Sequence, residues 1–460
     1  MAQAIPVRVP LATRPLGVFG TLRAARRNVL ELIPEMATRA WMVSGVTGLR
    51  WHMVMEPGAL RRVLRDRVQD YPKSEVTRLI LGPAIGQSLF IAEGDEWLWQ
   101  RRTAAPVFSQ RNVAALGPVM TAAAERAADR IGATAGRPVD AFHEMVTATF
   151  EVISDVTFSG GEGFDRAAVH RAIEGYIAQT AKVSLLDILG LPGWVPRPAR
   201  LRAGPALREM KGVADAAIER RRREGAPGVP DLLDLLIAGE DPKSGRRMTT
   251  AELRDNLLTF IVAGHETTAL TLGWALYLCA FDPGVQAAAR DEARAVLGGR
   301  AAEAGDVARL PLIRRIVDET LRLYPPAAFL SRTARADDEL CGREIRRGDT
   351  VILPIYAVHR HHALWREPDR FDPARFESPP ADRYAHIPFG DGPRICIGAS
   401  FAMQEAVVIL ATLLARFRFA PVAGRGPKPV MILTLRPEGG VWLTAEPVQG
   451  REGRGAEGRG

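Results

Sequence analysis

Apolar residues recur at helical spacing over much of the chain, and the longest such run covers residues 249–281. Thr249 and Glu252 form a capping-box pattern at its start, and Asp282-Pro283 follows its end. At about 1.5 Å per residue such a helix is roughly 45 to 50 Å long, enough to cross a whole domain. The sequence therefore predicts one long central helix.

The rest of the pattern is also mainly helical. Periodic apolar residues predict helices at 118–132, 205–223 and 399–417, whereas 49–55 and 350–353 have the pattern of short strands. No linker separates two hydrophobic cores, so we expect one large domain over residues 1–446. Residues 447–460, rich in Gly, Arg and Glu, are expected to form a disordered tail. The fold class is mainly α with a small β region.

The composition places the chain among ordinary globular proteins. It has 460 residues, of which 47% are hydrophobic and 25% charged. Lysine and arginine exceed the acids by 61 to 53, a net charge of +8. A basic balance fits nucleic acid, an anionic membrane or an acidic protein partner. Because the arginines are spread along the chain without interleaved aromatic residues, we expect no nucleic-acid partner.

The cysteine content and the lengths of the apolar stretches indicate the cellular compartment of the protein. Three cysteines are too few for a disulfide framework, and the absence of a Cys-x-x-Cys pair argues against zinc. The best candidate for a membrane span, 406–415, falls short of the roughly 20 residues that such a span needs. We therefore expect a cytoplasmic protein without a transmembrane anchor. The first thirty residues contain arginines and no acid, which is also typical of a targeting segment, and this alternative stays open.

One cysteine lies in an unusual loop. Residues 387–398 place Gly390, Gly392 and Gly398 around Cys396, and glycines permit tight backbone with positive φ. The predicted helix at 399–417 puts Cys396 near a helix N-terminus, where free N–H groups and the helix dipole favour a thiolate. A thiolate is the form that binds iron. The other two cysteines, Cys279 and Cys341, are expected to be structural.

The apolar pattern of the predicted long helix is interrupted by polar residues in its middle. Residues 264–268 read Gly-His-Glu-Thr-Thr between apolar flanks, although an interior glycine costs about 1 kcal/mol relative to alanine. Glu266 has no Lys or Arg three or four residues away to neutralise it. Local violations inside a consistent element usually mark function. The segment is therefore a candidate functional site, and we interpret His265 as structural.

These segments together resemble the cytochrome P450 family. Five motifs occur in the family's order: Trp97-x-x-x-Arg101, Ala263-Gly-His-Glu-Thr-Thr268, Glu319-x-x-Arg322, Pro373-x-Arg-Phe376 and Phe389-x-x-Gly-x-Arg-x-Cys-x-Gly398. The resemblance extends from about residue 70 to residue 443. It implies a triangular-prism fold in which haem b (iron protoporphyrin IX) lies between the long helix and the cysteine loop.

The resemblance also implies roles for individual residues. Cys396 would be the axial ligand of the iron, and Glu266 and Thr267 the acid–alcohol pair of oxygen activation. Residues implied to contact the haem, several of them through its propionates, are Trp97, Arg101, Ala263, Arg332, Phe389, Arg394 and Gly398. Glu319, Arg322 and Arg375 would fix the cysteine loop to the core.

The implied activity is that of a monooxygenase. One atom of O2 would be inserted into a C–H bond or added across a C=C bond, that is, hydroxylation or epoxidation. Electrons would come from a separate ferredoxin-type donor with its NAD(P)H reductase, which we expect to dock near Arg101 or Arg102, and the protein would be a monomer. A P450-type peroxygenase and a non-catalytic haem-binding protein are the alternatives; the acid–alcohol pair argues against both.

The substrate is expected to be lipophilic, such as a fatty acid, terpenoid or steroid, because few charges occur in the segments that line the family's substrate pocket. The apolar candidates in these segments are Leu79, Ile80, Leu81, Ile85, Leu185, Ile188, Leu189, Leu191, Ala327, Ala328, Phe329, Ile432 and Leu433. The histidine-rich segment 359–362 has no common metal-binding spacing and is interpreted as a solvated loop.

Overall fold

The long central helix is present. A computed structural model describes residues 5–14, 16–47, 49–158, 204–225, 230–431 and 433–448. Helix α13 (Thr250–Phe281) begins after Thr249, whose side chain accepts the Glu252 N–H while the Glu252 carboxylate accepts the Thr249 N–H. Asp282 ends α13 and caps α14 (Pro283–Leu297). Both predicted boundaries of the long helix are confirmed.

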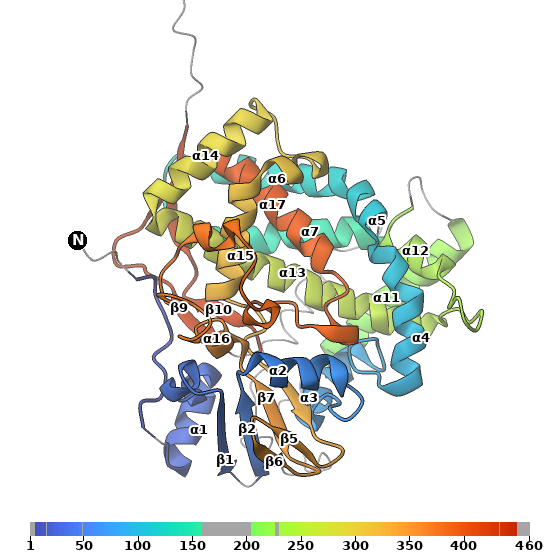
Figure 1. Ribbon diagram of the computed structural model, residues 1–460. Coiled ribbons are helices and arrows are strands. Elements are labelled where there is room, and N and C mark those ends of the chain that lie inside the picture. The colour runs from blue at the N-terminus through green and yellow to red at the C-terminus, as the bar shows by residue number, and fades with distance from the viewer. Residues whose placement is uncertain are drawn as a thin grey trace, which may run out of the picture.

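Other helices pack around α13 and make it the axis of the helical part (Figure 1). Its neighbours are α7 (Ala141–Phe158), α11 (Gly204–Glu224), α15 (Pro311–Leu323) and α17 (Ala399–Arg416). The remaining α-helices of the described residues are α1 (Val18–Arg27), α2 (Pro57–Arg61), α3 (Glu75–Ile85), α4 (Gly94–Ala104), α5 (Gln110–Ala115), α6 (Gly117–Gly132), α12 (Leu232–Ala238) and α16 (Ile355–Val358).

A small β region lies beside the helices, in the lower part of Figure 1. Its four-stranded sheet has the order β1-β2-β7-β4, in which β2 and β7 are parallel and the other pairs antiparallel. The sheet's strands are β1 (Met42–Thr47), β2 (Leu49–Val54), β4 (Leu330–Thr333) and β7 (Thr350–Leu353).

The other strands form three smaller sheets, with the orders β10-β9, β3-β11-β8 and β5-β6. They are β3 (Val139–Asp140), β5 (Asp338–Leu340), β6 (Arg343–Ile345), β8 (Phe417–Pro421), β9 (Lys428–Met431), β10 (Leu435–Glu438) and β11 (Trp442–Pro447). The predicted strands at 49–55 and 350–353 are thus confirmed, and the fold is mainly α with a small β region. The expected tail lies outside the described residues from residue 449 onward.

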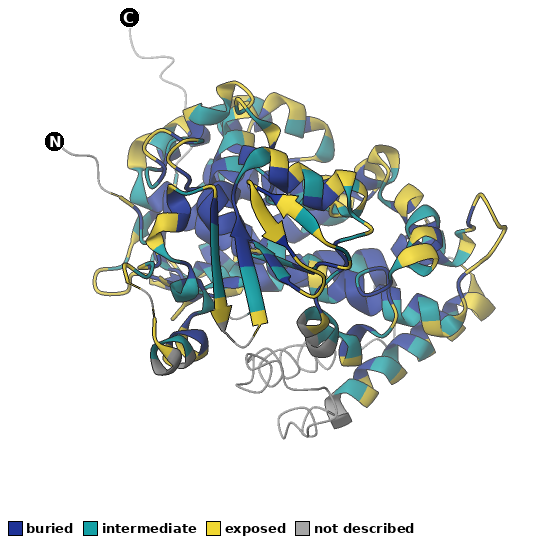
Figure 2. Ribbon diagram, turned by 60° about the horizontal axis from the view of Figure 1, so that its bottom comes forward, coloured by how far each residue is buried: buried dark blue, intermediate teal, exposed yellow. Residues whose placement is uncertain are grey.

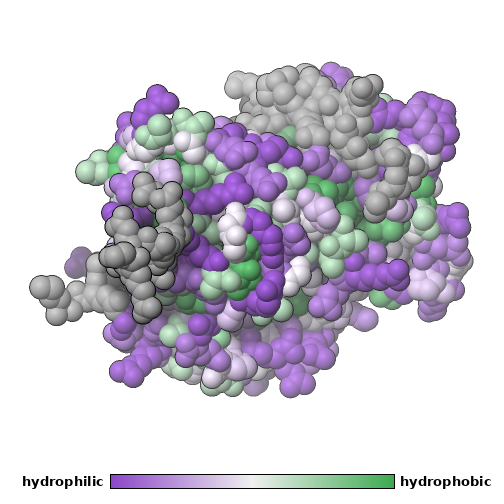
Figure 3. Space-filling model, turned by 90° about the horizontal axis from the view of Figure 1, so that it is seen from above, coloured by the Kyte–Doolittle hydropathy of each residue, from purple (hydrophilic) through white to green (hydrophobic). Residues whose placement is uncertain are grey.

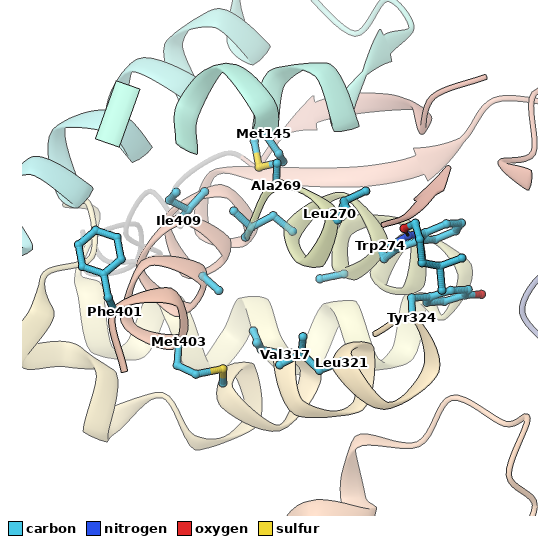
Figure 4. Packing of buried hydrophobic residues seen from close by; sticks show 14 of the residues in the cluster. Met145, Ala269, Leu270, Trp274, Val317, Leu321, Tyr324, Phe401, Met403 and Ile409 are labelled. Atoms are coloured by element: carbon cyan, nitrogen blue, oxygen red, sulfur yellow. Dashed lines mark hydrogen bonds between the residues drawn. The ribbon is translucent and has the colours of Figure 1, made fainter. Parts of the chain in front are cut away.

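The hydrophobic core lies where α7, α13, α15 and α17 meet. Side chains of these helices converge in Figure 4, and buried residues follow the central helices in Figure 2. The Trp274 ring stacks on Tyr324 with centroids 4.0 Å apart, and its indole N–H donates to the Leu435 carbonyl. These contacts fix α13 to α15 and to β10. The core therefore holds the middle of α13 in a defined position relative to α17.

The apolar character of α17 is explained by this core. Among the helices of the described residues, α17 alone is both long enough and apolar enough to span a membrane. However, 67% of this helix is buried inside the protein. On the face seen from above, hydrophilic residues predominate, with smaller hydrophobic areas between them (Figure 3). Burial in the core thus accounts for the composition of α17.

Candidate active site

A cavity of about 390 Å³ lies between α13 and the segment that precedes α17. It is lined mostly by apolar side chains, with a few polar groups, as ligand sites usually are. Of the site residues predicted from sequence, it brings together Trp97, Arg101, Ala263, Thr267, Arg332, Phe389, Arg394, Cys396 and Gly398. Glu266 does not line it. Nine of the ten predicted positions, separated by up to three hundred residues, therefore meet at one cavity.

The cysteine loop folds as its glycines allow. Gly390 and Gly392 have φ values of +72° and +73°, and a side chain at Gly392 would lie 2.1 Å from the Leu64 carbonyl oxygen. The Cys396 N–H donates to the Phe389 carbonyl at 3.0 Å and closes the loop. Gly398 has a φ of −89°, so the expectation of a positive φ there is wrong. Gly398 instead occupies the N-cap position of α17.

The sulfur of Cys396 is subject to opposing electrostatic effects. Cys396 is accessible from the cavity, but protein surrounds its sulfur, and this burial raises the pKa of the thiol. The Gly398 N–H and the positive charge of Arg101 lower that pKa by smaller amounts. The contacts expected to favour a thiolate are present, yet burial outweighs them. A metal ion bound in place of the proton would remove this conflict, since a coordinating thiol is deprotonated.

Three cations gather at one side of the cavity: Arg332 is buried, and Lys73 and Arg394 are partly buried. Burial and the neighbouring arginines lower the pKa of Lys73 well below its usual value, and burial with Arg394 lowers that of Arg332 to about 10. Burial likewise lowers the pKa of Arg394, which pairs with Glu93. The Arg332 Nε atom is buried without a hydrogen-bond partner. One carboxylate does not balance three cations, so the group fits the two propionates of a haem.

Lys73 is missing from the residues predicted by sequence. Its ammonium donates to the Phe90 carbonyl and lies 3.5 Å from the centre of the Phe90 ring. A single lysine after a Tyr-Pro pair has no motif that separates it from a solvated lysine. Only the antiparallel bridge between Lys73 and Arg332 brings it to the cavity.

Helix α4 contributes the predicted tryptophan and arginine. The Arg394 guanidinium lies over the Trp97 ring at 4.5 Å, which positions Arg394 by a cation–π contact. Arg101, one turn later, is the cation that interacts with the Cys396 sulfur. Arg102 forms two hydrogen bonds with the buried carboxylate of Asp241, at 2.6 and 2.9 Å. The Arg102 charge is therefore engaged within the protein, contrary to the expectation that it helps to dock an electron donor.

The polar segment of α13 presents two residues to the cavity. Ala263 is exposed and Thr267 partly exposed, although most of this helix is buried. The Thr267 hydroxyl donates to the Ala263 carbonyl at 2.8 Å, and Thr268 donates to the Gly264 carbonyl at 3.1 Å. The helix is continuous through Gly264. The hydroxyl groups of both threonines are therefore hydrogen-bonded to carbonyl groups of the same helix, four residues earlier.

Glu266 points away from the cavity. Its Oε1 atom accepts hydrogen bonds from Arg436 Nε at 2.6 Å and from the Thr434 hydroxyl at 2.5 Å. The sequence identified Glu266 as an acid without a neutralising neighbour on its own helix. The neutralising partner comes instead from β10, 170 residues later, where no local pattern could reveal it.

His265 has the structural role expected of it. The residue is buried, its Nδ1 lies 2.8 Å from the Ile261 carbonyl, and its ring packs edge-to-face on Phe150. Cys279 is fully buried in the core, while Cys341 is exposed at a turn. Neither cysteine lies at the cavity.

Glu319 and Arg322 form a fully buried ion pair, with distances of 2.6 and 2.8 Å between their polar atoms. Arg322 also donates to the carbonyls of His359, Pro368 and Arg370. Arg375 lies 3.4 Å from Glu319. The predicted locking role is consistent with these contacts, which fix the segment 359–375 to α15.

The histidine segment extends this network to the cysteine loop. His359 and His361 are fully buried, so the interpretation of 359–362 as a solvated loop is wrong. The His359 Nε2 atom accepts the Ile387 N–H at 3.0 Å, two residues before Phe389. Within the described residues no cluster of three or more His, Cys, Asp or Glu side chains has an arrangement that could hold a metal ion. His359 therefore connects Arg322 to the cysteine loop.

The expected substrate-contacting residues are only partly found at the cavity. Ala327 and Phe329 line it, whereas Ala328 is fully buried. Additional apolar lining comes from Ile153, Val156, Leu232 and Phe260, which no pattern in the sequence distinguishes from core residues. The candidates at 185–191 and 432 lie outside the described residues.

A mainly helical fold with a cysteine-lined apolar cavity below its central helix defines the class of haem-thiolate oxidoreductases. The family model described as Cytochrome P450 matches residues 40–446. The chain belongs to the cytochrome P450 family.

Known proteins of this family resemble the chain over most of its length. Cyclooctatin synthase from Streptomyces melanosporofaciens is 34% identical over 360 residues, covering 77% of this chain and 78% of the relative. Cyclooctat-9-en-7-ol 5-monooxygenase from the same organism is 32% identical over 419 residues, covering 88% of each. The crystal structure of the cytochrome P450DA heme domain superposes with a TM-score of 0.83 at 26% identity, covering 96% of this chain and 99% of that one.

Membership of this family settles the cofactor and the type of reaction. The protein binds haem b and is a monooxygenase, an oxidoreductase; enzymes of this family use O2, lipophilic substrates and redox partners.

Proposed function

We propose that Cys396 holds the haem iron and that the haem lies in the cavity between this cysteine and α13. The observation that carries the proposal is that Cys396 and the open positions of α13, Ala263 and Thr267, line one cavity. The haem supplies the oxidising chemistry when bound. Gly398 and Arg101 then stabilise the negative sulfur, and Phe389 restricts access to it.

The cation group at the cavity would hold the haem propionates. Lys73, Arg332 and Arg394 provide donors that the protein itself does not balance, and Trp97 fixes the direction of Arg394. Binding two carboxylates would neutralise this group without removing its existing contact with Glu93. The orientation of the haem would thus be set by charge as well as by shape.

Thr267 and Glu266 would transfer protons to the reacting group in the haem cavity. The Thr267 hydroxyl donates to the Ala263 carbonyl, and it can exchange this hydrogen bond for one to a ligand in the cavity. Glu266 would supply the proton to Thr267 as a general acid. The apolar lining of the cavity keeps bulk water from delivering protons indiscriminately.

For the substrate we propose a terpenoid-like hydrocarbon skeleton bearing a hydroxyl group. Two relatives are named for cyclooctatin and for cyclooctat-9-en-7-ol, and the latter name denotes a ring alkenol. The cavity supports the same class because Ile153, Val156, Leu232, Phe260 and Phe329 offer apolar surface. Hydroxylation or epoxidation of such a compound is the expected reaction.

Substrate class can be tested with the purified ferric protein. Polycyclic terpenoid alcohols such as sclareol and cedrol are expected to shift the haem from low to high spin, because an apolar ligand displaces water from the iron. Palmitic acid and progesterone serve as lipophilic alternatives, and amino acids as polar controls. A spin shift with polar compounds alone would contradict a lipophilic substrate, and a shift with palmitic acid alone would replace the terpenoid by a fatty acid.

We further propose a cytoplasmic, monomeric enzyme that receives electrons from an acidic ferredoxin served by an NAD(P)H reductase. The net charge of +8 favours an acidic donor, and Arg111 is exposed on α5, which packs against α17. Ile395, next to Cys396, is also exposed.

Reversing the charge of Arg111 tests this docking face. Arg111→Glu should lower the rate of reduction by a ferredoxin about tenfold at low salt, and less at high salt. The matched variant Arg418→Glu, on the distant strand β8, should have little effect. Equal rates for both variants would place the donor on another face.

A further inference from the structure

A serine, a histidine and an aspartate lie in a row on the four-stranded sheet. The Ser44 hydroxyl lies 2.8 Å from His52 Nδ1, and His52 Nε2 lies 3.1 Å from Asp349 Oδ2. Ser44 belongs to β1 and His52 to β2, whereas Asp349 directly precedes β7. None of the three lines the haem cavity, and their sheet lies in the lower part of Figure 1, below α13. A nucleophile, a base and an acid that orients the base form the catalytic triad of serine hydrolases.

The partners of the His52 ring determine which nitrogen carries the hydrogen. An ionised carboxylate only accepts hydrogen bonds, so the ring hydrogen lies on Nε2 and is donated to Asp349. Nδ1 of the neutral ring is then an acceptor, and the Ser44 hydroxyl donates to it. In the usual triad the serine contacts Nε2, so the two nitrogens have exchanged places here. Either nitrogen of imidazole can take up a proton, and His52 is therefore able to act as the base for Ser44.

Asp349 is held in a fixed position beside His52. Its Oδ2 atom also accepts the Arg346 N–H at 2.8 Å and lies 3.2 Å from a guanidinium nitrogen of Arg50. His52 and Asp349 are only 4% and 5% exposed. Burial strengthens the attraction between a carboxylate and a protonated imidazole. Asp349 can thus stabilise the charge that His52 acquires when Ser44 gives up its proton.

The strand pairing determines where the Ser44 N–H group points. Met55 N–H donates to the Trp41 carbonyl at 2.9 Å, and hydrogen-bonded pairs alternate with non-hydrogen-bonded pairs along antiparallel strands. Ser44 and His52 are therefore a non-hydrogen-bonded pair, in which the side chains are close together. The Ser44 N–H points away from β2, and β1 is the end strand of this sheet. At that edge the N–H can donate to the oxygen of a carbonyl group that Ser44 attacks.

The surface beside Ser44 suits a small ester. Ser44 is partly exposed, whereas His52 is buried behind it. Val46, two residues further along β1, projects from the same face of the strand and is 73% exposed. A single exposed apolar side chain offers enough surface for a short acyl group.

We propose that Ser44, His52 and Asp349 form a second catalytic site, which hydrolyses short-chain carboxylic esters without the haem. Ser44 Oγ attacks the carbonyl carbon while its proton passes to His52 Nδ1. The bond from that carbon to the alcohol oxygen breaks, the alcohol leaves with the proton from His52, and the acyl group stays on Ser44. Water then attacks the acyl group and gives a proton to His52, which returns it to Ser44 Oγ as the carboxylic acid leaves. No oxidant or reductant is consumed.

Covalent labelling of the purified ferric holoprotein tests this proposal without an electron donor. A biotin-linked fluorophosphonate should form a bond from phosphorus to Ser44 Oγ with loss of fluoride, and peptide mass spectrometry should locate the label there. The protein should also release p-nitrophenol from p-nitrophenyl acetate. Ser44→Ala should abolish the label and slow this hydrolysis about a hundredfold or more. Ser378→Ala, which removes an exposed serine, is the matched control and should leave both unchanged.

Two further variants distinguish an activated serine from one that is merely exposed. His52→Gln keeps a polar side chain but removes the base, and Asp349→Asn removes the charge that orients it. Each should slow the labelling of Ser44 about a hundredfold, although the serine is still present. Haem content and the urea midpoint show that a variant is folded, and one folded variant of the two is enough for the comparison.

Absence of label from Ser44 in the unaltered holoprotein would overturn the proposal. Equal labelling rates in the unaltered protein and in a folded His52→Gln or Asp349→Asn variant would also overturn it, because the serine would then react without a base. In either case the three residues would be a structural hydrogen-bond chain only. These outcomes leave the proposed role of Cys396 untouched, since neither the label nor the ester requires the haem.

Discussion

Replacing Thr267 by alanine is expected to separate oxygen consumption from product formation. Thr267→Ala removes the hydroxyl that α13 presents to the haem cavity, and this hydroxyl donates to the Ala263 carbonyl of its own helix. Haem content and substrate-induced spin shift should therefore stay unchanged. Product formed per electron should fall by about tenfold or more, because Thr267 passes on the proton of the general acid Glu266, and general-acid catalysis usually contributes at least that factor. The missing electrons should appear as hydrogen peroxide.

Thr271 provides the matched control for this experiment. It lies one turn further along α13, lines the same cavity and donates to the Thr267 carbonyl at 2.9 Å. Thr271→Ala should keep most of the product yield. Full coupling in Thr267→Ala, or equal loss in both variants, would contradict the assignment of Thr267 to the proton relay.

Arg322→Met is expected to have the largest effect on stability. Arg322 and Glu319 are both fully buried, and the substitution leaves the Glu319 carboxylate without its two-point partner. It also removes the donor to the carbonyls of His359, Pro368 and Arg370. Breaking a buried pair from one side costs about 3–5 kcal/mol. The free energy of unfolding, from urea denaturation of the holoprotein, should fall by that amount.

An exposed ion pair on the same helix, α15, provides the control for this stability measurement. Arg314 binds Asp318 at 3.0 Å, but its side chain is 46% exposed. Arg314→Met should lower the free energy of unfolding by less than about 1 kcal/mol, as for other surface pairs. Similar losses in the two variants would show that burial of Arg322 does not determine its contribution.

The sequence predicted those features that have a local pattern. The capping box at Thr249 fixed the start of α13, and the glycines of residues 390–392 indicated the loop that brings Cys396 to the cavity. The ranges 118–132 and 399–417 differ from α6 and α17 by one residue at one end. Such features depend on neighbours in the sequence, so a pattern can reveal them.

Features that depend on distant residues were missed. Arg436 neutralises Glu266 across 170 positions, and Lys73 joins the cation group through a bridge with Arg332. His359 looked like a solvated loop residue, because nothing nearby in the sequence shows that Arg322 and Ile387 bury it. Tertiary packing alone determines these environments, and a single sequence does not record it.

The carbon monoxide spectrum of the reduced holoprotein tests the central claim most directly. If the Cys396 sulfur is the axial ligand, the unaltered protein should show the red-shifted Soret band of a thiolate-bound haem. Cys396→His should still bind haem, because the cations and the apolar walls of the cavity remain, but should lose that band. A red-shifted band that persists in Cys396→His, or that is absent from the unaltered protein with haem bound, would contradict the account.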